Sequence, residues 1–107
     1  MKTLRDLEEV LGVELLSELS NISPERFHDG YLDYESATRL LFIFYVVYDL
    51  LGAYNKYGIR RWFSRRRAEL NNYTPRECLS GAWEPTEGRA PAVMKLAKLL
   101  AGKGGAK

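Results

Sequence analysis

The sequence has very few of the residues that most often carry out chemistry. Its 107 residues include one histidine, His28, and one cysteine, Cys78. A zinc site needs three or four clustered protein ligands, and a catalytic thiol needs a base beside it. His28 lies in a polar stretch, where we expect a solvated side chain, and Cys78 lies in a short helix, where we expect a small core residue. With no glycine-rich phosphate loop either, we predict no enzyme activity, no metal and no cofactor.

A lone cysteine cannot form an internal disulfide, and the charged, amphipathic start at Met1–Leu11 does not resemble a signal peptide. Both features favour a reducing compartment, so we expect a cytoplasmic protein. The longest apolar run, Leu40–Leu51 with Asp49 included, is far shorter than the ~20 residues that a membrane helix needs. We therefore expect no membrane partner.

The composition is that of one globular domain, with 46% hydrophobic and 28% charged residues. The net charge of +2 argues neither for nor against nucleic acid. The distribution of charge is more informative. Residues 1–38 hold nine of the 14 acidic residues, whereas residues 60–67 hold five arginines.

Start and stop signals predict three short helices before residue 33. Each begins after a capping residue and ends at a glycine or at an asparagine, which tolerates the left-handed conformation. The expected helices are 4–11 between Thr3 and Gly12, Val13–Ser20 before Asn21, and a short one that starts at Pro24 after Ser23, buries Phe27 and ends at Gly30.

The longest predicted helix covers Tyr34–Leu51 after an N-cap at Asp33. It is apolar on nearly all sides, which is typical of a helix buried on several sides. The run Phe42–Tyr48 also has the composition of a strand, but no second strand is evident for it to pair with. The expected core stripe is Ala37, Leu40, Leu41, Phe44, Val47, Tyr48 and Leu51. The surplus apolar surface predicts a symmetric dimer through part of Phe42, Tyr45, Val46 and Asp49.

The C-terminal part is predicted to hold three more helices. A helix over about Asn55–Ser64 buries Ile59, Trp62 and Phe63, and Arg65–Asn72 forms a loop. Thr74 to Glu77 is a capping box that starts a short helix ending at Gly81. A loop over residues 82–89 leads to a last helix, Ala90–Ala101, with Val93, Leu96, Ala97 and Leu100 inward, and a flexible basic tail.

The predicted fold is therefore an all-α compact bundle of about six to seven short helices. We divide the chain into a helix-turn-helix-like part at 1–33, a second helical part at 34–101 and the tail at 102–107. Residues 16–27 carry the helix-turn-helix rhythm, with Ile22 in the turn, although an ordinary helical corner explains them equally. Glu25 and Asp29 would face phosphates, so specific DNA binding should be weak.

Two features suggest binding surfaces. The arginine cluster, Arg60, Arg61, Arg65, Arg66 and Arg67, would contact phosphate or an acidic protein patch, or else is a solvated face that offsets the acidic N-terminal third. Trp83 lies in a loop, where a large aromatic side chain is either a lid on the core or an anchor for a partner.

The order of these signals resembles the toxin-binding domain of Xre/MbcA/ParS-type antitoxins. The resemblance covers roughly residues 37–101: an apolar helix ending at Gly52, then Trp62-Phe63, Leu70, the segment Tyr73–Leu79, Gly81, and a closing helix with Val93 and Leu96. Some positions depart from the family pattern. Asn71-Asn72 stands where glycines are common, Cys78 replaces an apolar residue, Arg65–Arg67 replaces a Pro-Asn type of turn, and the loop from Trp83 to Ala90 is longer.

The resemblance implies a type II antitoxin that blocks a RES-type, NAD-consuming protein toxin with its C-terminal segment, often as a dimer or larger assembly. The residues expected to bind the toxin are Trp83, Arg89, Met94, Lys95 and Lys98, because the last three lie off the apolar stripe of the closing helix. Two alternatives remain open: a helix-turn-helix transcriptional regulator that binds DNA, and a dimeric structural module.

Overall fold

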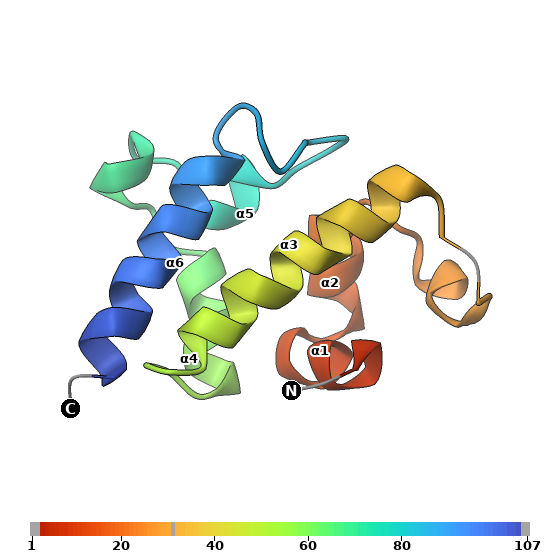
Figure 1. Ribbon diagram of the computed structural model, residues 1–107, viewed down its shortest axis with the longest axis horizontal. Helices are drawn as coiled ribbons and strands as arrows, with labels where there is room; N and C mark the ends of the chain where they lie inside the picture. The colour runs from red at the N-terminus through yellow and green to blue at the C-terminus, as the bar shows by residue number, and fades with distance from the viewer. Residues whose placement is uncertain (1–2, 31, 106–107) are drawn as a thin grey trace.

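The computed structural model describes residues 3–30 and 32–105, with the backbone alone described at His28 and at 103–105. Within these residues the chain forms six α-helices and two short 3-10 helices. The predicted all-α bundle is confirmed (Figure 1). The described residues include no helix that is long and apolar enough to cross a membrane.

The first two helices lie where the sequence predicts them. Helix α1 spans Leu4–Leu11, and the hydroxyl of Thr3 accepts a hydrogen bond from the backbone N–H of Asp6. Helix α2 spans Val13–Ser20 and ends at Asn21, which has a left-handed φ of 58°. These caps pair backbone groups that the helix ends leave without partners.

The third predicted helix is not an α-helix. Pro24–His28 forms the 3-10 helix η1, and the side chain of Ser23 makes no capping hydrogen bond to it. Phe27 is buried as expected. A five-residue 3-10 helix presents about one and a half turns of side chains, too few for a recognition helix in a DNA groove. The ordinary helical corner therefore describes this segment better than a helix-turn-helix.

Helix α3 spans Tyr34–Leu50, and Asp33 caps it by accepting from the N–H of Ser36. The positions that we predicted for its core stripe lie one residue after the positions that are buried. Because one residue is about 100° of rotation, Leu41, Tyr48 and Leu51 face outward. A helix that is apolar on nearly all sides has no unique stripe, so packing partners set the rotation. The buried residues of α3 are Ser36, Arg39, Leu40, Phe42, Ile43, Val46, Val47 and Leu50.

The rest of the chain follows the predicted order with shorter elements. Helix α4 spans Lys56–Phe63 and is capped by Asn55. The expected loop after it contains a 3-10 helix, η2, at Ala68–Leu70. The capping box at Thr74 is present, but helix α5 covers only Pro75–Cys78 and ends well before Gly81.

Helix α6 spans Ala90–Gly105, so it continues through most of the segment that we predicted as a flexible tail. Residues 106–107 of that tail lie outside the described residues. Helix α6 runs beside α3 in the same general direction (Figure 1). Their C-terminal ends meet where the backbone of Gly52 approaches that of Ala101.

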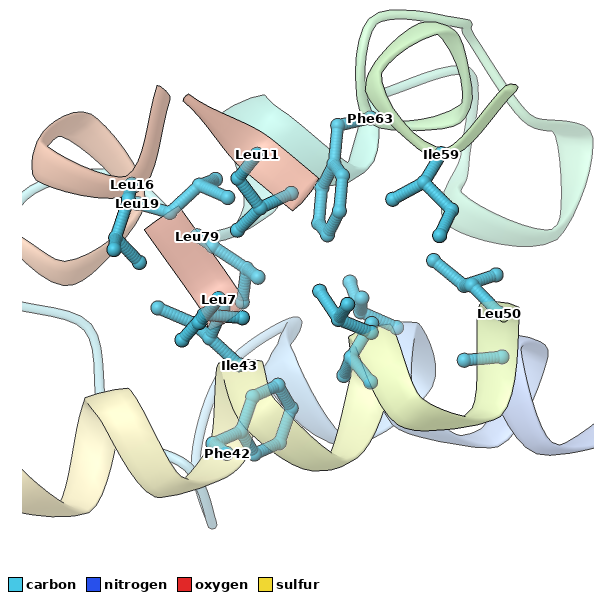
Figure 2. Close-up of a cluster of buried hydrophobic side chains, with 14 of the residues drawn as sticks. Leu7, Leu11, Leu16, Leu19, Phe42, Ile43, Leu50, Ile59, Phe63 and Leu79 are labelled. Carbon is cyan, nitrogen blue, oxygen red and sulfur yellow. The ribbon is translucent and has the colours of Figure 1, made fainter. Parts of the chain in front are cut away.

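The hydrophobic core lies between two layers of helices. Figure 2 shows α3 and α6 on one side and α1, α2 and α4 on the other, with aliphatic and aromatic side chains between them. Ile43, Val47 and Leu50 are wholly buried on the α3 side, and Ile59 and Phe63 face them from α4. The inner face of α3 is therefore the centre of the fold.

Candidate functional site

The outer face of α3 carries large side chains that the fold does not cover. Tyr34 is 80% exposed, Leu41 55%, Tyr45 51% and Tyr48 61%. We call these four residues the outer stripe. They are spaced by seven, four and three residues, which places them along one side of a helix. Exposed apolar groups that gather in this way mark interaction surfaces more often than isolated ones do.

A groove of about 450 Å³ runs along one side of the outer stripe. Its floor includes the ring of Phe42, and its far wall is the loop from Trp83 to Thr86. The volume lies within the ~300–1,000 Å³ of typical ligand pockets, and most of the lining is apolar. The lining residues are Tyr34, Glu35, Thr38, Arg39, Leu41, Phe42, Tyr45, Trp83, Glu84, Pro85, Thr86 and Met94.

Trp83 holds the loop wall of this groove in place. Its indole packs edge-on against Phe42, with ring centroids 5.1 Å apart, and its Nε1–H donates to the carbonyl of Leu19 at 2.6 Å. Leu19 lies in the last turn of α2, where carbonyls have no partner within the helix. Trp83 therefore acts as a lid on the core, one of the two roles that the sequence left open, while one part of it still lines the groove.

Arg39 forms the floor of the same region beside Trp83. It is buried, its Nε donates to the carbonyl of Ser20 at 2.9 Å, and Nη1 donates to the carbonyl of Trp83 at 3.4 Å. A buried guanidinium is costly unless its N–H groups find acceptors, and here they cap the end of α2. The network joins the N-terminal helices, α3 and the loop, so the groove has a rigid base.

The predicted toxin-binding residues are not brought together. Trp83 and Met94 line the groove, and Met94 packs partly against the core rather than pointing outward. Arg89 lies outside the groove, with its guanidinium 4.0 Å from the ring centroid of Tyr73. Lys95 and Lys98 are exposed on α6, and the Nζ of Lys98 lies 3.6 Å from a carboxylate oxygen of Asp49.

The four residues predicted for a dimer interface also differ in how far they are exposed. Val46 is wholly buried in the protomer's own core, and Phe42 is only 7% exposed and lines the groove. Tyr45 is exposed, and Asp49 is half-buried beside Lys98. The sequence therefore placed the candidate interface on α3 but misjudged the rotation of that helix.

Two members of the arginine cluster are bound within the protein. The Nε of Arg60 donates to the carbonyl of Val10 at 2.8 Å, and its Nη2 donates to that of Glu9 at 2.9 Å, which caps the end of α1. Arg66 donates to the carbonyl of Asn72 at 3.0 Å and pairs with Glu77 at 3.5 Å. The arginine cluster is therefore not only a solvated face, because Arg60 and Arg66 also hold parts of the fold together.

The lone cysteine and the acidic groups can be placed within the described residues. Cys78 is buried and free, and its desolvation raises the pKa of the thiol. Its prediction as a small core residue is confirmed. Within the described residues, no three His, Cys, Asp or Glu side chains gather closely enough to hold a metal ion. The side chain of His28 lies outside the described part of the chain.

Sequence reasoning missed Tyr34, Leu41 and Tyr48 as surface residues. Their signal was available, because Tyr34, Leu41 and Tyr48 recur every seven residues on a helix that is already rich in aliphatic residues, which indicates a second face. A search against protein-family models, curated proteins and solved structures finds no match for this chain. The function must therefore be argued from the site.

Proposed function

We propose that the chain is a protein-binding module, and specifically an antitoxin that neutralises a RES-type toxin by receiving a segment of it in the groove beside α3. One observation carries the proposal: an apolar groove with a rigid base lies beside an exposed aromatic stripe. Buried aromatic anchors in grooves of this kind supply most of the free energy of protein association.

The residues that resemble the antitoxin family support this proposal through their structural roles. Trp62 and Phe63 are buried, the Thr74 capping box starts α5, and Val93 faces the core from α6. Asn71 and Asn72 replace the usual glycines, and both have a positive φ, of 56° and 67°. Glycine adopts that conformation most easily and asparagine tolerates it, so the replacement is conformationally consistent.

Co-expression with a RES-type toxin tests the proposal. The variant is Thr38→Arg, which extends a long charged side chain across the groove, and we expect it to abolish both growth protection and pull-down of the toxin. The matched control is Ser80→Arg. Thr38 and Ser80 each donate a hydroxyl hydrogen bond to the carbonyl three residues earlier, but Ser80 lies outside the groove. Full protection by Thr38→Arg would contradict the proposal.

A second candidate occupant is another copy of this chain. The outer stripe has the alternating three- and four-residue spacing with which helices pair along a seam. The exposed parts of its three tyrosines amount to roughly 300–500 Å², from the typical area of an aromatic side chain. A standard interface takes about 800 Å² from each partner, so the stripe supplies about half of that area.

The charges around the stripe favour an antiparallel arrangement of two copies. Glu35 and Glu84 lie at the N-terminal end of α3, whereas Lys95 and Lys98 lie on α6 beside its C-terminal end. A two-fold axis near Leu41 places the acidic end of one copy against the basic end of the other. Such complementarity specifies the orientation of an interface.

A substitution at Tyr48 distinguishes the two candidate occupants, because Tyr48 belongs to the outer stripe but does not line the groove. If a second copy covers the stripe, the protein sediments as a dimer at tens of micromolar and Tyr48→Ala is a monomer. If only a toxin uses this face, the protein is a monomer throughout, and Tyr48→Ala still protects growth.

A further inference from the structure

Three arginines of the cluster remain without an acceptor. Arg61, Arg65 and Arg67 form no ion pair and no side-chain hydrogen bond in the described part of the chain, unlike Arg60 and Arg66. All three residues line a single hollow of about 160 Å³ at α4 and the segment that follows it. The hollow is lined by Tyr54, Gly58, Arg61, Trp62, Arg65 and Arg67.

Two of the residues that line this hollow also carry a buried N–H donor without an acceptor. Trp62 is only 1% exposed, and its Nε1 makes no hydrogen bond with any described residue. The same holds for Nε of Arg67, whose guanidinium lies 5.3 Å from the centroid of the Trp62 ring. More than nine-tenths of buried N–H groups in proteins are paired, so two orphans beside one hollow require an explanation.

A partner that accepts hydrogen bonds and carries negative charge would match both the orphaned N–H donors and the three arginines. Arginine guanidinium groups bind carboxylate and phosphate oxygens with paired N–H donors, and indole N–H groups only donate. The hollow has room for about five water molecules by their share of the liquid volume, which suits a single tetrahedral oxyanion. It is smaller than the ~300 Å³ at which pockets begin to enclose a nucleoside-sized ligand.

We propose that this hollow is an oxyanion site that binds one phosphoryl group through Arg61, Arg65 and Arg67, with the Trp62 indole N–H and the Arg67 Nε–H as buried donors. The phosphoryl group comes either from the backbone of a nucleic acid or from a free phosphate ester. The site is independent of the groove beside α3, from which none of these residues is drawn.

The most specific reporter of the site is the indole N–H of Trp62, which gives its own proton–nitrogen NMR resonance. Inorganic phosphate is titrated into the full-length protein at constant ionic strength, with chloride in the reference. We expect the Trp62 resonance to move and to saturate, while that of Trp83, already bonded to Leu19, stays in place. Phosphate should also raise the thermal midpoint, because a ligand of the native state stabilises it.

The test variant is Arg61→Gln with Arg65→Gln. Both side chains are exposed and unpaired among the described residues, so their loss should leave the fold intact. The matched control is Arg5→Gln with Arg26→Gln, which removes the same charge from another part of the surface. We expect the dissociation constant for phosphate to rise at least about tenfold in the test variant, from lost charge-assisted hydrogen bonds, and to change little in the control.

A short DNA duplex in the same titration identifies the source of the phosphoryl group. Tighter binding than inorganic phosphate, with a salt dependence whose log–log slope falls by about two in the test variant, indicates a nucleic-acid backbone. Binding no tighter than phosphate indicates a free ester. The proposal is overturned if the Trp62 resonance does not saturate with phosphate, or if it moves equally in the test variant.

Discussion

Both faces of α3 carry large apolar side chains, but the fold buries only one of them. The inner face buries Ile43, Val47 and Leu50 between the two layers of the bundle, whereas the outer face leaves Leu41 and Tyr45 more than half exposed. Burial of the inner face stabilises the fold. The outer face is largely exposed in the monomer, which is why we propose a role for it in binding.

The sharpest contrast between the faces should come from truncating one aliphatic residue on each. Ile43→Ala removes a fully buried side chain, and we expect it to lower the free energy of unfolding by about 2–5 kcal/mol. Leu41→Ala removes one that is 55% exposed, and its effect should stay within about 0.5 kcal/mol. Urea unfolding followed by circular dichroism measures both. Equal losses would mean that the outer face supports the fold.

The next largest effect concerns the loop that walls the groove. Trp83→Phe keeps a ring against Phe42 but removes the N–H that caps Leu19, leaving a buried carbonyl without its donor. We expect a loss of about 1–3 kcal/mol in thermal or urea unfolding. Tyr73→Phe, which changes an exposed aromatic, serves as the control. A neutral Trp83→Phe would show that the loop is not fastened to α2.

A smaller effect is expected at the start of α5. Thr74→Ala removes the hydroxyl that accepts from the N–H of Glu77 at 3.0 Å. Loss of an N-cap costs about 1 kcal/mol. Thr86→Ala, which removes an exposed threonine from the groove wall, should be neutral for stability. A thermal midpoint unaffected by Thr74→Ala would contradict the role of the capping box.

The smallest effect is a pH dependence at the contact between α2 and α5. The side-chain hydrogen bond from Arg76 holds the pKa of Glu18 below its ordinary value of 4.5. A lowered folded-state pKa contributes stability above the unfolded-state value, and this contribution is lost as the pH falls through the folded-state value. Because both side chains are nearly half exposed, we expect less than about 1 kcal/mol.

Glu18→Gln tests this contribution. The variant should be slightly less stable than the wild type at pH 6, and the difference should shrink as the pH falls below about 4.5. Glu14→Gln on the same helix controls for the change in net charge. A difference that stays constant down to pH 3 would rule out the Glu18–Arg76 contact as its source.

Local signals made most of the secondary structure predictable. Thr3, Asp33 and Thr74 each cap the helix expected of them, because capping depends only on residues within one turn. The rotation of α3 was not predictable, since an all-round apolar helix is oriented by its neighbours. Arg39 shows why: its burial depends on the carbonyls of Ser20 and Trp83, which are distant in sequence.

The candidate sites were predictable only in part for the same reason. Trp83 and Met94 could be selected as chemically suitable, but their meeting with Tyr45 in one groove follows from the packing of α6 on α3. The arginine cluster was evident from composition. Which of its arginines are bonded within the protein depends on the carbonyls and carboxylates that the fold brings near them. Arg60 is an example, because it donates to a carbonyl at the end of α1.

The most direct test of the outer face is a matched pair of double variants. Leu41→Ser with Tyr45→Ser changes the outer stripe, and Leu99→Ser with Tyr57→Ser changes the same residue types, of nearly equal exposure (56% each), elsewhere on the surface. Thermal unfolding and binding to the co-expressed partner, whether toxin or second copy, are measured on both. We expect similar thermal midpoints for the two double variants, and loss of binding only in the variant that changes the outer stripe. Binding retained by the first variant, or lost equally in both, would contradict it.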